Sequence, residues 1–504
     1  MTEIFFNRYI QYVLKNLNQV LKPEESVYLV GGVVRDLFLN RDIYDIDLAV
    51  KGNVRKIARL FANNIKAPFF MLNESFDTAR VVWTTENNTK IFIDLVGLRG
   101  SSIEADLKAR DFTINAVAID IKSPNHVIDP NGGLQDIQSK LIRSCSVNTF
   151  NDDPLRILRA VRQSVIFGFR FEDQTLAQLK RSIDLIRSVS DERLRDELFK
   201  LFDLENPAVP LVLLNHLGII PKIFNEIKDL LFYQWPSIPS ESVWDHTISA
   251  IKNMSLLFDV LVGEYKSGGA HELQSGKAVL KLGRFRESLE DYFQESISAE
   301  RSVKSLLFFC AFLHDVGKQQ SERKREDGSI SFRGHNVFSL ALFENTAERL
   351  ALSNLEIKWG GLVIKNHMEI HQAAKDPGDV DSRWLYRFIK TNQDAGIGLV
   401  FFSLADCLAH QYELDFEARY EKELNISRKI YDAYFGEDDR LRNPPKYLDG
   451  REIMSLTQLE AGPKLGQLIR QLEEETAIGN LNSTQEAVAY VKDVAKVLNT
   501  GSPN

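Results

Sequence analysis

The spacing of apolar residues divides the chain into two regions with different expected secondary structure. From about residue 26 to 130, short apolar runs alternate with stretches of helical spacing, which indicates a mixed α/β domain. The predicted strands are SVYLV (26–30), DIDLAV (45–50), ARVVWTT (79–85), IFIDLV (91–96), INAVAID (114–120) and HVIDP (126–130). After NDDPLRILRAVR (151–162), apolar residues recur at helical intervals nearly to the end, so the last two thirds are predicted to be helical.

Two polar stretches suggest boundaries inside the helical region. VGEYKSGGAHELQSGK (262–277) predicts a surface insertion or mobile loop, and GEDDRLRNPPKYLDG (436–450) predicts a linker before a small tail. We therefore expect an α+β protein, in which a mixed α/β head is followed by helical domains. The predicted domains span residues 1–145, 146–225, 226–436 and 437–504.

The composition of the 504 residues narrows the class of protein. No run approaches the roughly 18 apolar residues of a membrane span, and the stretch before Lys22 predicts an amphipathic helix rather than a signal peptide. The three cysteines are isolated, which excludes a disulfide framework and suits a reducing cytoplasm. The formal charge of −8 argues against indiscriminate coating of nucleic acid, but it is compatible with a local basic groove.

Three acids in apolar strands are the first candidates for chemistry. Asp45 and Asp47 lie two residues apart, so their side chains point to the same face of a strand. Asp94 lies in a second such strand. Carboxylates held this close repel one another unless a cation lies between them, and three of them can hold two Mg²⁺ ions. The alternative is a solvated end of the sheet.

Gly31 and Gly32 follow a predicted strand and open a predicted helix that contains Arg35 and Asp36. Glycine lets backbone N–H groups approach an anion closely, and a helix N-terminus favours phosphate. A plain turn explains the same two glycines. The glycine pair therefore indicates a phosphate site only in combination with the neighbouring acids.

Three motifs, taken together, resemble one family. GGVVRDLFL with DID, DLKARDFTINAVAID (106–120) and DDPLRILRAVR (152–162) resemble, in order and spacing, the bacterial-type (class II) tRNA nucleotidyltransferase and poly(A) polymerase family, which includes the CCA-adding enzymes. The resemblance implies a polymerase-β-like catalytic head at 1–145 and a helical neck at 146–225 that selects the nucleotide and binds RNA. It also implies a helical tail at 437–504, in which Gly462 and Pro463 before a helix are candidates for a tRNA contact; the alternative is a plain helix start.

The resemblance assigns roles to residues of this chain. It implies that Asp45 and Asp47 bind two catalytic Mg²⁺ ions; the strand pattern, not the resemblance, adds Asp94 as a third candidate catalytic acid. It implies a set of residues around the triphosphate and sugar of the nucleotide: Gly31, Gly32, Arg35, Asp36, Arg110, Asp111 and Asn115. Many members have two arginines before the aspartate of the second motif, whereas this chain has Ala109 and Arg110, which predicts weaker triphosphate binding or a substitute cation.

Asp153 and Arg156 are candidates for reading a nucleobase. The acid accepts and the arginine donates hydrogen bonds, and residues three apart share one helical face. The resemblance makes this pair the protein template that selects ATP or CTP. The alternative is that Asp153 before Pro154 only caps a helix. We expect other charged residues of the neck to contact phosphates or to brace the nucleotide pocket, and the alternative is that they form a solvated helix face. These residues are Arg159, Arg162, Glu192, Arg193 and Arg195.

Histidines and aspartates in the middle of the chain form a second set of motifs. WDHT, FLHDVGK, GHN, KNHMEIH and LADCLA resemble the HD superfamily of metal-dependent phosphohydrolases, which implies an HD-type domain at 226–436. The expected ligands of one or two divalent ions such as Ni²⁺, Mn²⁺ or Mg²⁺ are His246, His314, Asp315, His335, His367 and Asp406. His371 shares a helical face with His367, and Lys318 would offset phosphate charge. The alternative is an inert helical module that keeps these residues as buried polar groups.

The two resemblances together predict a function with named rivals. The expected activity is template-independent addition of CMP and AMP, from CTP and ATP, to the 3′ end of tRNA, while the HD-type domain hydrolyses 2′,3′-cyclic or 2′-phosphates. Rivals in the same family add only A, only CC or a poly(A) tail. The rival of another class is an HD phosphohydrolase whose degenerate head binds RNA. We expect a cytoplasmic protein with no membrane partner, and the sequence leaves its oligomeric state open.

Overall fold

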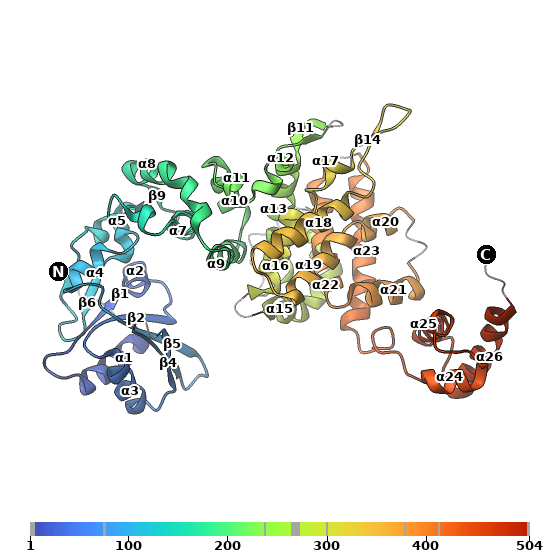
Figure 1. Cartoon of the computed structure of the whole chain (residues 1–504), viewed down its shortest axis with the longest axis horizontal. Helices are drawn as coiled ribbons and strands as arrows, with labels where there is room; N and C mark the ends of the chain where they lie inside the picture. The colour runs from blue at the N-terminus through green and yellow to red at the C-terminus, as the bar shows by residue number, and fades with distance from the viewer. Residues whose placement is uncertain are drawn as a thin grey trace. The chain divides into compact units, whose positions relative to one another are not determined.

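The computed structural model describes residues 6–73, 77–235, 238–263, 273–298, 301–376, 378, 380–411 and 414–500. The chain divides into two compact units, which Figure 1 traces by residue number. The first comprises Met1–Arg193 and His216–Ile223, and the second comprises Leu194–Asn215 and Phe224–Asn504. Among the described helices, none combines the length and the apolar character that a membrane crossing requires.

A seven-stranded mixed sheet forms the centre of the first unit. Its strand order is β3-β4-β5-β2-β1-β6-β7, in which β2 and β5 pair in parallel and the other neighbours pair antiparallel. The strands are β1 (Ser26–Val30), β2 (Asp45–Lys51), β3 (Phe69–Asn73), β4 (Thr78–Thr84), β5 (Lys90–Gly97), β6 (Ala118–Asp120) and β7 (Val127–Ile128).

The sheet differs from the sequence prediction at two places. The edge strand β3 was missed, because its apolar run is short and flanked by no strong turn signal. The predicted strand INAVAID begins too early, because Thr113–Asn115 forms a 3₁₀ turn. The side chains of that turn make buried hydrogen bonds; for example, the hydroxyl of Thr113 donates to Asp136 at 2.7 Å.

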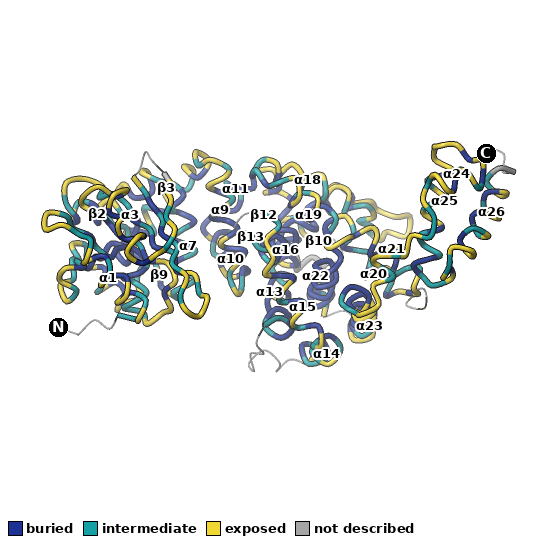
Figure 2. The backbone as a smooth tube through the Cα atoms, turned by 90° about the horizontal axis from the view of Figure 1, so that it is seen from below, coloured by how far each residue is buried: buried dark blue, intermediate teal, exposed yellow. Residues whose placement is uncertain are grey.

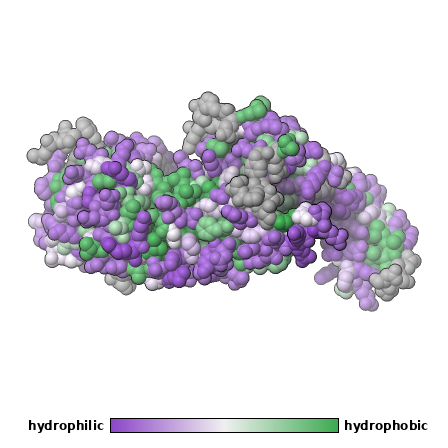
Figure 3. Space-filling model, turned by 90° about the horizontal axis from the view of Figure 1, so that it is seen from above, coloured by the Kyte–Doolittle hydropathy of each residue, from purple (hydrophilic) through white to green (hydrophobic). Residues whose placement is uncertain are grey.

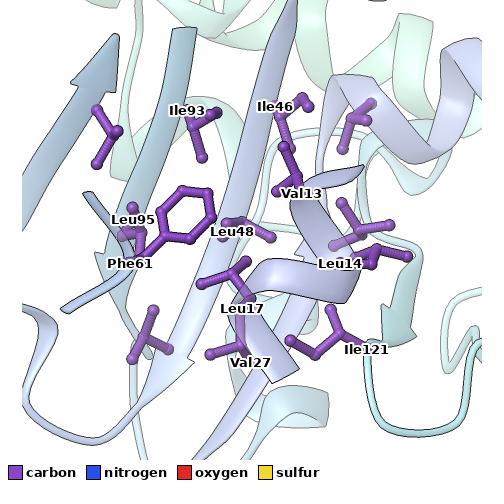
Figure 4. Packing of buried hydrophobic residues seen from close by; sticks show 14 of the residues in the cluster. Val13, Leu14, Leu17, Val27, Ile46, Leu48, Phe61, Ile93, Leu95 and Ile121 are labelled. Atoms are coloured by element: carbon purple, nitrogen blue, oxygen red, sulfur yellow. The ribbon is translucent and has the colours of Figure 1, made fainter. Parts of the chain in front are cut away.

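The main apolar core covers one face of this sheet. Ile46 and Leu48 alternate with Asp45 and Asp47 along β2, and they pack against α1 (Arg8–Val20) and α3 (Val54–Asn64), as the labelled side chains in Figure 4 show. The period of two therefore leaves both aspartates on the opposite face. A smaller cluster that includes Val30, Ala49 and Leu107 covers part of that second face.

Further helices of the first unit lie between the strands of the sheet or follow them. They are α2 (Gly32–Phe38), α4 (Ile103–Lys108), α5 (Gly133–Ser139), α6 (Thr149–Asp152), α7 (Arg156–Phe167), α8 (Asp173–Ser182) and α11 (Ile220–Ile223), with a short parallel pair β8 (Leu141–Ile142) and β9 (Arg170–Phe171). The helix α9 (Asp191–Phe202) contributes its first residues to this unit and the rest to the second.

The second unit is helical, as predicted. Its helices are α10 (Ala208–His216), α12 (Lys228–Leu231), α13 (Val243–Leu261), α14 (Leu273–Leu282), α15 (Arg286–Gln294), α16 (Val303–Leu313), α17 (Lys318–Ser321), α18 (His335–Arg349), α19 (Asn354–Asn366), α20 (Glu369–Ala373), α21 (Ser382–Asn392), α22 (Ala395–Ala409), α23 (Phe416–Phe435), α24 (Gly450–Thr457), α25 (Pro463–Ala477) and α26 (Thr484–Thr500). Every residue of α22 is buried, which Figure 2 shows as an unbroken dark segment, so the other helices pack around it.

The expectation that strands end near residue 150 was too simple. Short hairpins connect helices of the second unit: β10 (Gln234–Trp235) with β11 (Ile238–Ser242), β12 (Ser296–Ser298) with β13 (Arg301–Ser302), and β14 (Arg323–Lys324) with β15 (Ile330–Ser331). Strands of two to five residues leave almost no apolar pattern, so the sequence gives little sign of them.

The structure can be compared with only part of what was predicted for the two polar stretches, 262–277 and 436–450. Residues 264–272 of the predicted insertion lie outside the described residues, and Leu273 already begins α14. Residues 436–449, the predicted linker, contain no helix or strand. The tail beyond them has its own apolar core, which includes Ile453, Leu468 and Val491. On the face drawn in Figure 3 hydrophilic side chains predominate and apolar groups are scattered, as is ordinary for a protein surface.

Candidate active site and metal centre

The strand acids lie together, as the sequence predicted. Asp47 on β2 is the direct partner of Asp94 on β5, so the two side chains share a face with Asp45. Burial and the neighbouring Asp94 raise the pKa of Asp47 to about 6. Burial also raises the pKa of the more exposed Asp45. A carboxyl group with a raised pKa beside two other acids favours binding of a cation.

Asp94 has a partner that the sequence analysis missed. Arg80 on β4 lies directly opposite Asp94, and its Nε and Nη2 donate to the two carboxylate oxygens at 2.7 and 2.8 Å. Both oxygens of Asp94 are therefore occupied by a guanidinium. Asp45 and Asp47 are the acids of this face that fit a divalent ion, and a catalytic role for Asp94 stays a prediction.

Gly31 leaves room for the carboxylate of Asp47 and the guanidinium of Arg110. It has φ of 75°, and a Cβ atom there would lie 3.1 Å from Oδ2 of Asp47 and 3.2 Å from Nη1 of Arg110. A side chain would fill the space between these two charged groups. The buried Asp106 orients Arg110 by accepting from its Nε at 2.9 Å. Gly32 then begins α2, as predicted.

The other predicted nucleotide-binding residues form one chain of hydrogen bonds. Arg35 donates to both oxygens of Asp36 at 2.9 Å and to Asn115 Oδ1 at 2.6 Å. Asn115 donates in turn to Asp111 Oδ1 at 3.0 Å, and Arg159 donates to Asp111 Oδ2 at 3.2 Å. Burial alone would raise the pKa of Asp111. The guanidinium of Arg159 and the amide of Asn115 nevertheless hold this pKa below its usual value. This network fixes residues from α2, the 3₁₀ turn and α7 at one place.

The proposed base-reading pair is held by different partners. Asp153 accepts from Nη2 of Arg193 at 2.8 and 3.1 Å, whereas Arg156 donates to the backbone carbonyls of Thr149 and Ala109 at 3.2 and 3.1 Å. Arg193, a predicted brace of the pocket, thus contacts the acid directly. Ala109 supplies a carbonyl that positions Arg156.

The helix start at this pair differs from the sequence prediction. The first residue of α7 is Arg156, and its N-cap is Leu155, so the predicted cap at Asp153 is wrong by two residues. Asp153 instead accepts from the Leu155 N–H at 3.2 Å in the turn before the helix. A Pro at the next position favours extended backbone at Asp153, which delays the helix.

The remaining charged residues of the neck have separate environments. Arg162 is half-buried on α7, and Glu192 is exposed on α9. Arg195 donates to Asp196 and to the carbonyl of Ala351. These contacts give Arg195 a structural role within the second unit.

The six predicted ligands of the HD-type centre converge from five helices. All six side chains are buried, with at most 7% exposed. Their places are α13 for His246, the turn after α16 for His314 and Asp315, the first residue of α18 for His335, the end of α19 for His367, and α22 for Asp406.

Asp315 lies between two groups of nitrogens. Its Oδ2 is 3.2 Å from Nε2 of His314 and 3.5 Å from Nε2 of His246, whereas its Oδ1 is 3.3 Å from Nε2 of His335 and 4.0 Å from Nε2 of His367. Each group has its ligand atoms within 4.8 Å of one another, the spacing a metal ion needs. Asp315 is thus placed to bridge two ions.

The hydrogen bonds of the histidines leave their Nε2 atoms free for a cation. The Nδ1 atoms of His314, His335 and His367 lie 2.8, 3.0 and 2.7 Å from backbone carbonyls, and because a carbonyl only accepts, each Nδ1 carries the proton. The two Nε2 lone pairs of His335 and His367 then face each other at 2.9 Å, and Nε2 of His314 has no hydrogen-bond partner among the described residues. A divalent ion in each of the two groups would satisfy these atoms, one at His314 and one at His335 and His367, so the residues fit a metal.

The structure changes the interpretation of His371 and adds two residues, Glu423 and His410. His371 lies between two acids, with its Nε2 3.0 Å from Asp406 Oδ2 and its Nδ1 2.8 Å from Glu423 Oε1. Although burial favours a neutral ring, Glu423 and Asp406 raise the pKa of His371 to about 10. His371 is therefore a cationic support of Asp406 rather than a ligand. Lys318 pairs with Asp315 at 2.5 Å, and the missed His410 joins a third potential ligand group with His246 and Asp406.

Comparisons with known proteins agree with the head resemblance. The family model described as "Poly A polymerase head domain" matches residues 27–143, and the one described as "Probable RNA and SrmB- binding site of polymerase A" matches residues 168–231. Two structures titled as CCA-adding enzymes, one with ATP and one from Thermotoga maritima with tRNA, superimpose with TM-scores of 0.61 and 0.56. Each alignment covers 98% of this chain and 96% of the other at 21 and 22% identity, and it shows a common fold.

Three curated relatives bear names from one family. A CC-adding tRNA nucleotidyltransferase of Geobacter sulfurreducens is 41% identical over 52% of this chain and 59% of its own length. An A-adding tRNA nucleotidyltransferase of Deinococcus radiodurans is 27% identical over 92% of this chain and 94% of its own. A CCA-adding enzyme of Streptococcus uberis is 32% identical over 61% of this chain and 75% of its own. The chain therefore belongs to the tRNA nucleotidyltransferase and poly(A) polymerase family.

Proposed function

We propose that this protein adds nucleotides to the 3′ end of tRNA without a nucleic-acid template, using CTP and ATP. The observation that carries the proposal is that Asp47 lies beside Gly31 and Arg110 and shares one face of the sheet with Asp45. The names of relatives that add CC, A or CCA to tRNA support the same reaction class.

The residues of the head would act on the two ends of the reacting nucleotide. Asp45 and Asp47 would hold Mg²⁺, which when bound stabilises the charge that develops on the attacking and leaving oxygens. Arg110, oriented by Asp106, would bind the triphosphate near Gly31. The 3′ hydroxyl of the RNA forms the new bond to the α-phosphorus, the bond to the bridging oxygen breaks, and pyrophosphate leaves.

Asp153 and Arg156 would choose the base. The carbonyls of Thr149 and Ala109 fix the guanidinium of Arg156, so its remaining N–H groups have a set direction. Arg193 would orient the carboxylate of Asp153. An acceptor and a donor held in this way can recognise the edge of a cytosine or an adenine.

Extension of defined transcripts tests this function. The protein is incubated with Mg²⁺ and with tRNA transcripts that lack CCA, end in C or end in CC, and CTP and ATP are supplied separately and together. We expect two C and one A to enter in order. Addition of only C, only A or a long A tail would assign one of the narrower activities, and no extension of any transcript would contradict the proposal.

We propose a second activity for the HD-type domain, the hydrolysis of a 2′,3′-cyclic phosphate or a 2′-phosphate by bound Ni²⁺, Mn²⁺ or Mg²⁺. The facing Nε2 atoms of His335 and His367, with Asp315 beside them, are the observation that favours it. A water oxygen would bond to phosphorus, the bond from phosphorus to one ribose oxygen would break, and that oxygen would take the proton. Hydrolysis of 2′,3′-cyclic AMP, compared between the wild type and His314→Ala, tests the activity; equal rates would contradict it.

The four predicted domains and the cytoplasmic location remain parts of this proposal. The separate core of the tail supports a boundary near residue 437, and the three cysteines, all free thiols, support a reducing compartment.

A further inference from the structure

A basic hairpin lies between two predicted ligands of the HD-type centre. After Asp315 the chain forms α17, then the hairpin of β14 and β15, and it returns to the centre at His335. Figure 1 shows this hairpin projecting beyond the helices of the second unit. We refer to residues 322–334 as the basic hairpin.

The base of the basic hairpin is fixed against the centre. A Cβ atom on Gly317 would lie 2.4 Å from the His335 carbonyl and 2.5 Å from the Ser339 nitrogen, so only glycine allows α17 and α18 to approach this closely. The Gly317 N–H donates to Ser339 Oγ at 2.9 Å. At the other end, the carbonyl of Phe332 in the hairpin accepts from Nδ1 of His335 at 3.0 Å. The hairpin and the metal ligands therefore share hydrogen bonds, and the hairpin begins and ends at the centre.

The charge of this segment is opposite to that of the chain. The basic hairpin has four cations and three acids, whereas the whole chain has a formal net charge of −8. Three of the cations, Arg323, Lys324 and Arg325, are consecutive and exposed.

Two of the three acids have partners within the protein. Glu322 accepts from the hydroxyl of Tyr233, and Asp327 accepts from the N–H and hydroxyl of Ser329 at 2.9 and 2.6 Å. The three consecutive cations therefore face solvent as a local positive group, which suits contact with a phosphate backbone.

We propose that the basic hairpin binds the phosphate backbone of an RNA whose 3′ end enters the HD-type centre, an inference that rests on the proposed hydrolytic function. A free nucleotide small enough to sit among the ligands has no backbone that could extend to the tip of the hairpin. The hairpin would accordingly favour a terminal phosphoester of an RNA chain over a free nucleotide as the substrate of the centre.

The test compares a hairpin variant with a matched control. Arg323→Gln, Lys324→Gln and Arg325→Gln are combined in one full-length protein. The control combines Lys252→Gln, Lys358→Gln and Lys422→Gln, which are exposed lysines of the same unit outside the hairpin. Binding of a short single-stranded RNA that ends in a 3′-phosphate is measured by fluorescence anisotropy over a range of salt concentrations, and hydrolysis of free 2′,3′-cyclic AMP is measured with Mn²⁺.

We expect the hairpin variant to bind the RNA about tenfold more weakly at low salt. The slope of log K against log salt should decrease in magnitude by about 2, because each lost phosphate contact removes about 0.7 for single strands. Hydrolysis of free 2′,3′-cyclic AMP should be unchanged, and the control should match the wild type in both measurements. RNA binding and a salt slope equal to those of the wild type would overturn the proposal.

The two proposals fail in different ways. If the wild type hydrolyses no 2′,3′-cyclic AMP with Mn²⁺, Ni²⁺ or Mg²⁺ while the hairpin variant still loses RNA affinity, the hydrolytic function is wrong and the RNA contact stands. If hydrolysis is present and the hairpin variant binds RNA normally, the hydrolytic function stands and the contact is wrong.

Discussion

The head site and the HD-type centre use similar acids but differ in how far their geometry is set in advance. In the head, Asp45 and Asp47 come from one strand, and Asp45 is exposed. In the centre, the ligands come from five helices and are all buried, and carbonyls orient three of the imidazoles. The acids of the head are thus more exposed, whereas the side chains of the centre are buried and oriented before any ion binds.

The two sites also balance charge differently. In the head, arginines pair with the acids next to the metal position, as Arg80 does with Asp94 and Arg110 with Asp106. In the centre, cations lie behind the ligands: His371 supports Asp406. The comparison teaches that an open site can use substrate charge as part of its balance, but a buried site needs its counter-charges within the protein.

The largest expected effect separates the two sites. Asp45→Asn with Asp47→Asn should lower nucleotide addition by at least about 10³-fold, because the acids that hold the cation lose their charge. Hydrolysis of 2′,3′-cyclic AMP should be unchanged. Primer extension measures the loss, and Asp42→Asn, which changes an exposed acid just before β2, is the control that should retain activity.

The reverse separation is expected from Asp315→Asn. Because Asp315 lies between both groups of nitrogens, its loss should weaken metal binding at the centre by more than about 100-fold, beyond the effect expected of a supporting residue. Isothermal titration with Mn²⁺ measures the affinity, and Asp291→Asn on the surface of α15 is the control. A variant that binds the ion as well as the wild type would show that Asp315 is no ligand.

A smaller effect is expected from the support of Asp406. His371→Gln keeps one hydrogen bond but removes the charge between Asp406 and Glu423, so the metal affinity of the centre should fall about tenfold. His216→Gln, at an exposed position, should have no effect. A complete loss of binding would instead identify His371 as a ligand.

The smallest effect is a difference in pH dependence. The pKa of Asp47 is about 6 because of burial and Asp94, so below pH 6 a proton competes with Mg²⁺ at the head, and its affinity should fall about fourfold from pH 7 to 5.5. At the centre, burial lowers the pKa of His246 to about 4 and that of His367 to about 3, so protons should compete at these two rings only at lower pH. Burial also opposes the charged form of His314, but the carboxylates of Asp315 and Asp406 raise the pKa of His314 above its usual value, so protons should compete at this ring at a higher pH than at Asp47. Equal pH profiles for the two sites would remove this distinction.

Much of the head site could be predicted from sequence because its geometry is local. The period of a strand alone places Asp45 and Asp47 on one face, and the parallel partner Asp94 follows from the same pattern. Arg80 could have been found in the same way, since it alternates with apolar residues in the adjacent predicted strand. Asp106 gave no signal of its own, because a helix residue that orients an arginine looks like any surface acid.

The motifs predicted the six candidate ligands of the HD-type centre, but they gave no sign of Glu423 and His410. Glu423 lies 52 residues after His371, and only packing of α20 against α23 brings them together. His410 follows Asp406 by one helical turn and was passed over because a single histidine is usually structural. Such non-local pairs depend on helix packing angles that the apolar pattern of one helix does not contain.

The most direct test of the account is Mn²⁺ binding to the head in the presence of a non-hydrolysable CTP analogue. Electron paramagnetic resonance is recorded on Asp315→Asn protein, so that the centre contributes little signal, with and without Asp45→Asn and Asp47→Asn. We predict a Mn²⁺ ion that binds together with the nucleotide and is lost when both acids are replaced. Equal Mn²⁺ binding in the two proteins would contradict the claim that these strand acids hold the catalytic cation.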